Sequence, residues 1–401
     1  MGYLKALEVS VALNQLATDF RATCTRIPLT TTSGGRTVEA VALKNPEPED
    51  RIPVLFVGGV HAREWAPPDA LLGFAQRLLT ARANASDIVY PEFVSGGISY
   101  SSPNYRITAA QIAGFFKKFE LIILPLVNPD GRDTSVKATT KTEQGWRKNR
   151  RQTTGQCRGV DINRNFPIAW EHTDYYSPAA AMKADISTRP CHPEVYKGPS
   201  AGSEIETQNV MNLVTTRKIR AYVDVHMSGR NIQHPWGMER NQTDNPARTF
   251  DEAGFNHLPA LPNSGRDGLL GDGYSEFIND TLLQRHKAIA EAMRAEIESS
   301  AGANPLAIRR SKYRVMQSVD AGIRQRETFI GCSDDWVFSR QFVDQTMPEC
   351  VAFTIECGLE AGDNPDNPAD NDGGFFPNFN TQFPKIEREV HAGLFGLLKA
   401  L

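Results

Sequence analysis

The stretch IPVLFVGGVHAREW, residues 52–65, joins a continuous apolar run to a group of charged side chains. The run at 52–60 does not alternate with polar residues, which is typical of a strand covered by helices on both faces of its sheet. His61, Arg63 and Glu64 follow where the run ends. Open α/β sheets gather ligands at the carboxyl ends of their strands, so the stretch predicts both a fold class and the position of a site.

Similar apolar runs recur along the chain, with helical patterns between them. The runs are FELIILPLV at 119–127, IRAYVDV at 219–225 and CVAFTIE at 350–356. Residues 69–83 carry leucines at helical spacing, Ser203 and Glu206 have the spacing of a capping box, and 384–401 is amphipathic. This order predicts an α/β fold with a mixed, largely parallel central β-sheet and helices on both faces.

The composition is that of an ordinary globular protein. The chain has 401 residues, 40% hydrophobic and 23% charged, which is enough for one large α/β domain or two smaller ones. The formal net charge is -3 and no long basic block occurs, so nothing indicates binding to nucleic acid or an anionic membrane. No apolar stretch reaches the roughly 20 residues of a membrane span, and MGYLKALEVS lacks the regions of a signal peptide.

The cysteine pattern argues against a thiolate zinc site, because none of the six cysteines forms a CxxC pair. An even number permits disulfides, and buried free thiols are an equally open interpretation. The cysteines are Cys24, Cys157, Cys191, Cys332, Cys350 and Cys357.

Three residues at the ends of two apolar runs have the composition of a catalytic zinc site. His61 and Glu64 follow the first run, and His226 follows the run at 219–225. Two imidazoles and one carboxylate leave a fourth position for water, as a catalytic Zn²⁺ requires. A lone histidine at a strand end is more often structural, and HxxE alone is a weak signal. The hypothesis therefore depends on further residues.

Glu356 ends the run at 350–356 and is the candidate general base. A carboxylate in such an apolar strand is costly to bury unless it serves a charge or accepts a proton. It could take a proton from a water whose pKa a metal has lowered. The plainer alternative is a carboxylate exposed to solvent at the strand end.

Polar side chains between the ligand segments supply further candidates. WRKNRR at 146–151 and GVDINRNFP at 159–167 contain Arg147, Asn163 and Arg164. Arginines bind carboxylates bidentately and stabilise oxyanions, although clustered arginines are usually a solvated basic face. Asp161 could accept a hydrogen bond from the second ring nitrogen of a ligand histidine.

With these segments in order, the chain resembles the zinc metallocarboxypeptidase family of the pancreatic carboxypeptidase A and B type. The resemblance rests on HAREW, NPDGR, WRKNR, GVDINRNFP, YKGPSAGSEIET, VDVHMSGRNIQHPWG and FTIECG, and it covers nearly the whole chain. It implies a single α/β/α catalytic domain over 1–401, with loop insertions around 170–199 and 240–274. It also implies one Zn²⁺ and the removal of C-terminal amino acids from peptides.

The resemblance assigns a role to each candidate residue. His61, Glu64 and His226 would bind zinc, with Asp161 orienting His61. Glu356 would be the catalytic base and Arg147 would stabilise the oxyanion. Asn163 and Arg164 would bind the free C-terminal carboxylate of the substrate, and Arg63 would line a neighbouring part of the cleft.

The segment RETFIGCSDDW, at 326–336, bears on side-chain preference. Its SDDW motif resembles that of the B-type enzymes. The resemblance implies that Asp334 lies at the base of the specificity pocket, and it predicts a preference for C-terminal Lys or Arg. The segment departs from the family where a mobile tyrosine is expected, because that position falls on Glu327. The chain also reads LEAGDNP after FTIECG, where the family usually continues with Arg-Asp.

Other functional readings remain open beside the exopeptidase. One is a zinc amide hydrolase acting on N-acyl amino acids or cell-wall peptides, and another is a non-catalytic relative that binds peptides. The substrate in either catalytic case is a peptide or small amide with a free carboxylate, and we expect a monomer. The resemblance implies a Cys157–Cys191 disulfide, hence an extracellular or periplasmic, oxidising location.

Overall fold

The apolar runs form the centre of one sheet. The computed structural model describes residues 2–47, 50–100, 105–176, 185–256, 274–322, 328–360, 362 and 370–401. Within them an eight-stranded sheet has the order β1-β2-β8-β3-β9-β14-β10-β13. The strands are β1 (Cys24–Pro28), β2 (Glu39–Leu43), β3 (Ile52–Gly58), β8 (Phe119–Leu124), β9 (Ala221–Met227), β10 (Asn231–His234), β13 (Arg314–Gln317) and β14 (Val351–Cys357).

The sheet is mixed, with a parallel centre, as the sequence predicted. Strands β8, β3, β9 and β14 run parallel to one another. The β1–β2 hairpin joins β8 in antiparallel fashion, and β10 joins β14 in the same way while pairing in parallel with β13. The two outer pairs were not predicted, because their strands are short and do not read as long apolar runs.

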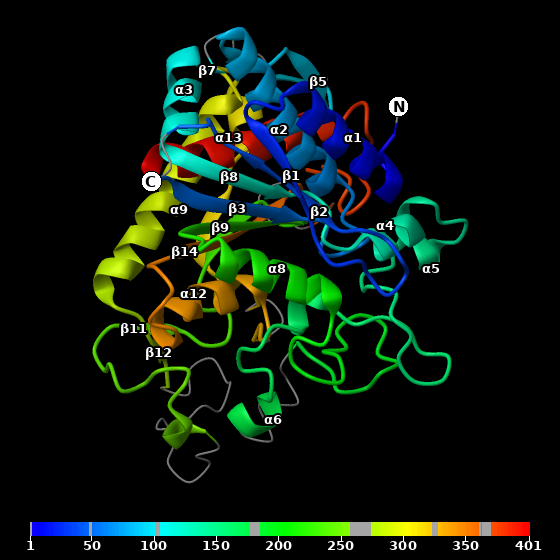
Figure 1. The fold of residues 1–401 in the computed structure, drawn as a ribbon, viewed down its shortest axis with the longest axis vertical. Coiled ribbons are helices and arrows are strands. Elements are labelled where there is room, and N and C mark those ends of the chain that lie inside the picture. Colours follow the sequence, from blue (N-terminus) through cyan, green and yellow to red (C-terminus); the bar gives the residue numbers. More distant parts are fainter. Residues whose placement is uncertain are drawn as a thin grey trace.

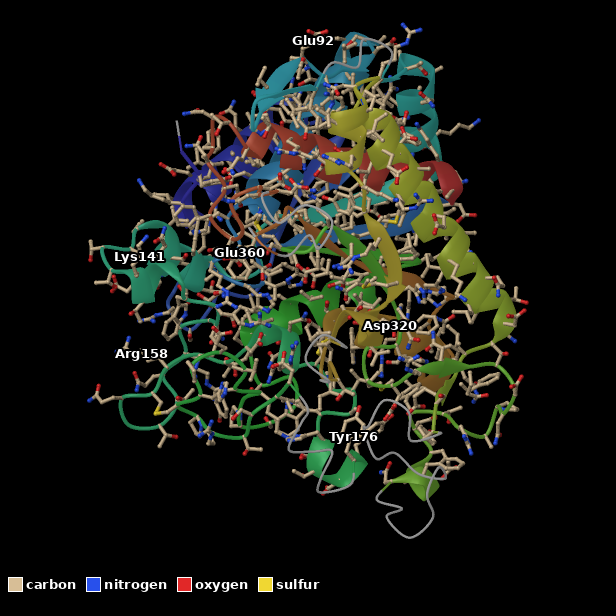
Figure 2. All side chains as sticks on the ribbon, turned by 180° about the vertical axis from the view of Figure 1, so that it is seen from behind. Glu92, Lys141, Arg158, Tyr176, Asp320 and Glu360 are labelled. Carbon is tan, nitrogen blue, oxygen red and sulfur yellow. A yellow bond between two sulfur atoms is a disulfide. The ribbon has the colours of Figure 1, made fainter. Side chains whose placement is uncertain are left out.

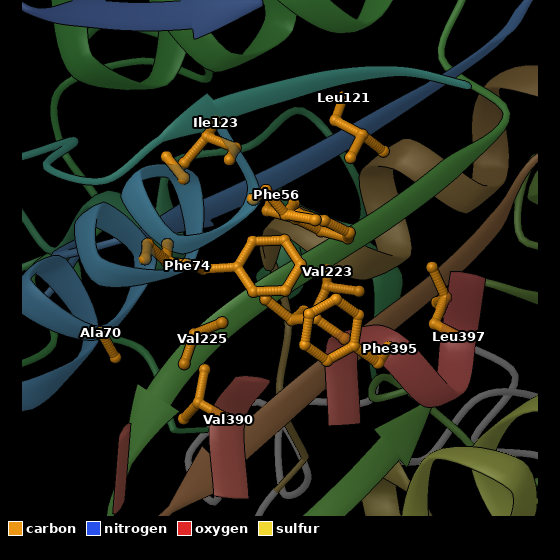
Figure 3. Packing of buried hydrophobic residues seen from close by; sticks show 14 of the residues in the cluster. Phe56, Ala70, Phe74, Leu121, Ile123, Val223, Val225, Val390, Phe395 and Leu397 are labelled. Carbon is orange, nitrogen blue, oxygen red and sulfur yellow. The ribbon is translucent and has the colours of Figure 1, made fainter. Parts of the chain in front are cut away.

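Helices cover both faces of the sheet (Figure 1). One layer contains α1 (Ala6–Asp19), α2 (Ala66–Asn84), α3 (Ala109–Lys118), α9 (Asp280–Ser300) and α13 (Phe383–Ala400), and the other contains α8 (Ile205–Thr216) and α12 (Ser333–Val343). Successive strand side chains point to opposite faces, so Phe56 packs in the first layer and Leu55 in the second. Figure 3 shows Phe74 of α2 and Phe395 of α13 packed near Phe56. The predicted α/β/α fold is confirmed.

The remaining elements are short and lie around this core. They are the helices α4 (Pro129–Val136), α5 (Lys141–Gln144), α6 (His172–Tyr175), α10 (Pro305–Arg310) and α11 (Ser318–Gly322), the 3₁₀ turns η1 (Ile162–Arg164) and η2 (Ala253–Phe255), and the strand pairs β4 (Ile88–Val89) with β7 (Arg106–Ile107), β5 (Phe93–Ser95) with β6 (Ile98–Tyr100), and β11 (Asn241–Gln242) with β12 (Glu276–Phe277).

Local predictions at two element ends were wrong. Ser203 does not cap α8, because that helix begins one residue later than a capping box requires and its N-cap is Glu204. The Ser203 hydroxyl instead donates to a Glu204 carboxylate oxygen at 2.6 Å. Strand β9 continues to Met227, so His226 lies within the strand and not beyond it. Pairing with β14 through Cys357 extends the strand past its apolar run.

The expected insertions carry little regular structure where they are described. The described part of 170–199 contains α6 and a β-bridge between Ser187 and Tyr196. The described part of 240–274 contains β11 and η2. Residues 177–184 and 257–273 lie outside the described part of the chain.

The strand order changes direction at β3, and this places the site. The chain leaves β3 for β8 on one side and later returns to β9 on the other side. Such a switch leaves a crevice at the carboxyl ends of the two strands. Gly59 makes the turn out of β3 with a φ of +65°, which a residue with a side chain rarely adopts. His61 and Glu64 follow directly.

The predicted disulfide between Cys157 and Cys191 is present. The other four cysteines, Cys24, Cys332, Cys350 and Cys357, are free and buried. Among the described residues, no helix combines the length and hydrophobicity that crossing a membrane requires.

Candidate active site and metal centre

The three predicted metal ligands meet at the carboxyl ends of β3 and β9. All three side chains are buried, and one ligand atom from each of His61, Glu64 and His226 lies within 4.8 Å of the others. The Nδ1 atoms of the two histidines are 3.1 Å apart. One Glu64 oxygen lies 2.6 Å from His61 Nδ1, and the other lies 3.0 Å from His226 Nδ1.

This donor set fits a tetrahedral zinc ion. With Zn–N bonds of about 2.0–2.1 Å, two ligand nitrogens of a tetrahedral site lie about 3.3 Å apart, close to the observed Nδ1 separation. Burial raises the pKa of Glu64, but the charges of His61 and His226 outweigh it and hold that pKa below its usual range. Glu64 is therefore an anion, as a ligand must be.

Each ligand histidine has a carboxylate behind it. His61 Nε2 lies 3.2 Å from an Asp161 oxygen, as predicted, and His226 Nε2 lies 3.0 Å from an Asp224 oxygen. These contacts turn both Nδ1 atoms toward the common centre and make the rings better ligands. Asp224 was missed in the sequence, although it is the polar residue two positions before His226 in an otherwise apolar run and therefore on the same face of the strand.

Glu356 stands beside His226, because the two residues are register partners on the neighbouring parallel strands β14 and β9. One of its carboxylate oxygens is buried and makes no hydrogen bond within the described chain. Burial raises the pKa of Glu356 to about 8, with the charges of Glu64 and Asp224 adding to it and those of His226 and Arg147 opposing it. A carboxyl with such an oxygen can accept and return a proton.

Arg147 is fixed against the metal segment by two contacts. Its carbonyl accepts a hydrogen bond of 2.9 Å from the Ala62 amide, and its Nε donates to Asp161 at 3.0 Å. Asp161 also caps η1 by accepting from the Asn163 amide at 3.1 Å. One buried carboxylate thus positions a ligand, an arginine and the turn that carries Asn163 and Arg164.

Asn163 and Arg164 border the same cavity, but they differ in how many of their polar atoms are already hydrogen-bonded. The Asn163 side-chain oxygen accepts from the Ser333 amide at 2.8 Å, which leaves the amide nitrogen for the cavity. Arg164 donates from Nη2 to the Asp185 carboxylate at 2.5 Å and from Nε to the Asp185 carbonyl at 2.5 Å. No sequence pattern predicted the contact with Asp185.

Arg63 also faces the cavity and has a carboxylate partner. Its two terminal nitrogens donate to the two Glu194 oxygens at 2.8 and 3.2 Å, and its guanidinium lies 4.4 Å from the centre of the Phe375 ring. Glu194 was not predicted as a site residue. Both residues of this pair line the cavity.

All these side chains border one cavity of about 700 Å³. Four arginines line it: Arg63, Arg147, Arg164 and Arg314. Six carboxylates line it: Glu64, Asp185, Glu194, Asp320, Asp334 and Glu356. Glu64 belongs to the metal cluster, and Asp185 and Glu194 pair with Arg164 and Arg63, so the charges of these carboxylates are already compensated.

Asp334 lies in a polar part of this cavity. It is buried, and one of its oxygens accepts from the Ser318 hydroxyl at 3.1 Å. Asn231, Gln233, Ser318 and Thr354 line the same cavity. Asp320 of α11 also borders it and is labelled in Figure 2. The neighbouring Asp335 instead accepts the Gly237 amide with both oxygens, at 3.0 and 2.9 Å, and so has a structural role.

One predicted departure lies outside the described part of the chain. Glu327, at the position where a mobile tyrosine was expected, falls in residues 323–327.

Comparisons with known proteins agree with this geometry. A family model described as zinc carboxypeptidase matches residues 9–391. Carboxypeptidase B of Helicoverpa zea is 29% identical over 219 residues, 53% of this chain and 41% of that protein. Carboxypeptidase B of Astacus astacus is 25% identical over 259 residues, 63% of this chain and 70% of that protein. The chain thus spans less than half the length of the Helicoverpa zea relative.

Solved structures share the fold at low identity. Thrombin activatable fibrinolysis inhibitor matches with a TM-score of 0.66 and 17% identity, over 99% of this chain and 74% of that one. Carboxypeptidase A from Helicoverpa armigera matches with a TM-score of 0.60 and 19% identity, over 99% of this chain and 74% of that one.

Proposed function

Because this chain belongs to the zinc carboxypeptidase family, we propose that it is a zinc-dependent exopeptidase that removes the C-terminal residue from peptides. The observation that carries the proposal is the meeting of three groups in one cavity. These are the His61, Glu64 and His226 cluster, the Glu356 carboxylate and the Arg147 guanidinium.

Each group has one chemical task in this proposal. When bound, Zn²⁺ acts as a Lewis acid that polarises the scissile carbonyl and lowers the pKa of water. Glu356 takes the proton from the attacking water and passes it to the leaving amine. The terminal nitrogens of Arg147, whose Nε is held by Asp161, donate to the oxygen that becomes negatively charged. Preorganised donors and a positioned base together favour the transition state over the bound substrate.

Recognition of the chain end falls to Asn163 and Arg164. An internal residue of a peptide offers no carboxylate to an arginine and an amide donor, so this pair selects the last residue. Asn163 contributes its amide nitrogen, whose direction follows from the hydrogen bond between its oxygen and Ser333. Arg63, held by Glu194, faces a neighbouring part of the substrate.

We also propose a preference for Lys or Arg as the residue released. Asp334 is buried in the polar part of the cavity, and burial raises its pKa, so the carboxyl gains most from a cationic partner. An apolar side chain would leave that carboxyl desolvated and without a cationic partner, which costs binding energy.

Peptide hydrolysis with and without a chelator tests the main proposal. We expect the zinc-loaded protein to release only C-terminal residues from a panel of short peptides, and a chelator to stop the release. Glu356→Gln should lower kcat by at least about 100-fold, because the proton acceptor is lost. Its zinc content should match that of the wild type, since Glu356 is not among the three clustered ligands.

The matched control is Glu349→Gln, which makes the same change at an exposed residue before the opposite end of β14. Its kcat should equal that of the wild type. Full activity in Glu356→Gln, or equal cleavage of peptides with and without a free C-terminus, would overturn the proposal.

Matched peptides ending in Arg and Phe test the side-chain preference. We expect the wild type to have the higher kcat/KM for the Arg peptide, and Asp334→Asn to lower the Arg-to-Phe ratio by about 100-fold, because a desolvated charge pair is lost. Asp19→Asn at the exposed end of α1 is the control. A wild-type preference for Phe would reject the role of Asp334 while leaving the exopeptidase proposal standing.

We also propose an extracellular or periplasmic compartment. Disulfides persist in oxidising environments, so the Cys157–Cys191 bond supports an extracellular or periplasmic location.

A further inference from the structure

The arginine proposed to bind the substrate's carboxylate already holds a carboxylate of its own chain. Arg164 is buried, and its Nη2 and Nε donate to the side chain and the carbonyl of Asp185, each at 2.5 Å. This contact uses the Nε and Nη2 edge, one of the edges by which arginine binds a carboxylate through two hydrogen bonds.

The rest of the Arg164 guanidinium is also engaged. Its Nη1 donates to the Asn163 carbonyl at 2.7 Å and lies 3.4 Å from Cys332 Sγ. The Phe329 ring centre lies 5.3 Å from its central carbon. A second carboxylate therefore cannot bind Arg164 through its Nε and Nη2 edge while Asp185 stays in place.

Asp185 is held in this position by its surroundings. Its amide donates to the Thr328 carbonyl at 3.2 Å. Two residues after Asp185, Ser187 forms a β-bridge with Tyr196. The Cys157–Cys191 disulfide ties the same segment to the loop between Arg147 and Asp161. The Asp185 side chain keeps 25% of its surface exposed and borders the cavity, so a ligand can reach it.

We propose that Asp185 determines substrate specificity by competing with the C-terminal carboxylate for Arg164. This inference rests on the proposed exopeptidase function. With Asp185 in place the pair carries no net charge, so a terminal carboxylate gains less from Arg164 than from an unpaired arginine, and it meets a like charge. The wild-type site therefore favours a free carboxylate over a neutral terminal amide by less than a site with an unpaired Arg164 would.

Removing the charge of Asp185 tests the competition. Asp185→Asn should lower KM for a peptide with a free C-terminus by at least about tenfold and change kcat by less than about threefold, because binding of the carboxylate improves equally in the ground state and in the transition state. The inhibition constant of the released amino acid should fall in parallel. The inhibition constant of the same amino acid as its primary amide should stay unchanged.

Two further variants separate competition from a structural effect. Asp185→Glu keeps the charge and should keep the KM of the wild type within about threefold. Asp174→Asn removes an equal charge from an exposed site in the same insertion and should have no effect on KM or on either inhibition constant. Urea unfolding of each variant establishes that it is folded.

Each result decides the inference. An unchanged KM in Asp185→Asn would show that Asp185 does not compete. A higher KM, or a lower kcat on every substrate, would mean that Asp185 positions Arg164, and the inference would be wrong. Both outcomes are measured on a wild type that releases C-terminal residues in a chelator-sensitive way. If the wild type releases no residue, the proposed function itself fails, and this inference fails with it.

Discussion

At the scale of single residues, each of the two ligand histidines has an aspartate beside its Nε2 atom, and the two aspartates come from different parts of the chain. Asp161 supports His61 across a gap of 100 positions, whereas Asp224 supports His226 from two positions earlier on the same strand. Asp224 is itself held by the Ser333 hydroxyl at 2.7 Å. Each carboxylate lies beside the Nε2 atom of its ring, on the side away from the common centre, and so favours the ring orientation that a ligand needs.

Substituting these carboxylates should weaken metal binding. We expect Asp161→Asn and Asp224→Asn each to lower the affinity for Zn²⁺ by about 10 to 100-fold, because the ring loses its anionic partner. Competition with a chromophoric chelator measures the affinity. Asp161→Asn should also lower kcat in zinc-saturated protein, since Asp161 holds Arg147, whereas Asp224→Asn should leave Arg147 in place.

Equal zinc affinity in either variant and the wild type would mean that the corresponding carboxylate does not support its ligand. The exposed substitution Asp19→Asn provides the baseline for this comparison.

The ligands and the candidate base could be predicted from the sequence because each follows or ends an apolar run. Their neighbours were harder to identify. Asp185 and Glu194 lie in an insertion without strand or helix periodicity, so no pattern indicates which arginines they meet. Their contacts depend on the path of the chain between Arg164 and the disulfide, which is a tertiary property.

At the scale of elements, the four central strands were predicted because burial on both faces leaves a continuous apolar pattern. Strand ends were less accurate for β9, which extends beyond its apolar run to carry His226, whereas the predicted run at 350–356 already contained Glu356. A polar residue interrupts the apolar pattern of the sequence, but the backbone hydrogen bonds between strands continue past it. A strand that carries a functional residue at its end is therefore predicted too short. Strands β10 and β13 form the polar side of the cavity and carry no apolar run at all.

Helices α9 and α13 pack so closely that a glycine is required between them. A Cβ on Gly396 would lie 2.6 Å from Met293 Cα and 2.8 Å from the Ala292 carbonyl oxygen. We expect Gly396→Ala to lower the free energy of unfolding by about 1–3 kcal/mol, because the backbone of α9 must move. Urea unfolding of the two proteins measures the difference.

Gly114 of α3 is the matched control for this substitution. A Cβ there would meet no atom within 4 Å. Gly114→Ala should therefore raise the free energy of unfolding by about 0.5–1 kcal/mol through helix propensity alone. Destabilisation by both substitutions would argue against close packing as the cause at Gly396.

At the scale of the whole molecule, buried titratable groups away from the site link stability to pH in opposite directions. His391 of α13 lies between the Tyr90 hydroxyl at 2.8 Å and the Ala70 carbonyl at 2.6 Å, and burial lowers its pKa to about 4. Glu206 of α8 lies beside Asn149, and burial, with the charge of Glu204 adding to it, raises its pKa to about 7. In the folded protein His391 stays neutral by losing a proton, whereas Glu206 stays neutral by keeping one.

The two groups should give pH effects of opposite sign. The folded pKa of His391 is below its unfolded value of about 6.5, so its contribution is complete above pH 6.5 and falls as the pH decreases toward 4, by about 2 kcal/mol at pH 5. The folded pKa of Glu206 is above its unfolded value of about 4.5. Its contribution is therefore complete below pH 4.5 and is lost as the pH rises through 7, by about 3 kcal/mol.

Single substitutions isolate each group because every other titration is common to variant and wild type. Unfolding free energies at pH 5 and pH 8 give the comparison. His391→Gln should lose less stability than the wild type on going from pH 8 to pH 5. Glu206→Gln should lose less on going from pH 5 to pH 8, since glutamine mimics the protonated carboxyl. A variant whose pH dependence parallels that of the wild type would show that its group titrates normally in the folded protein.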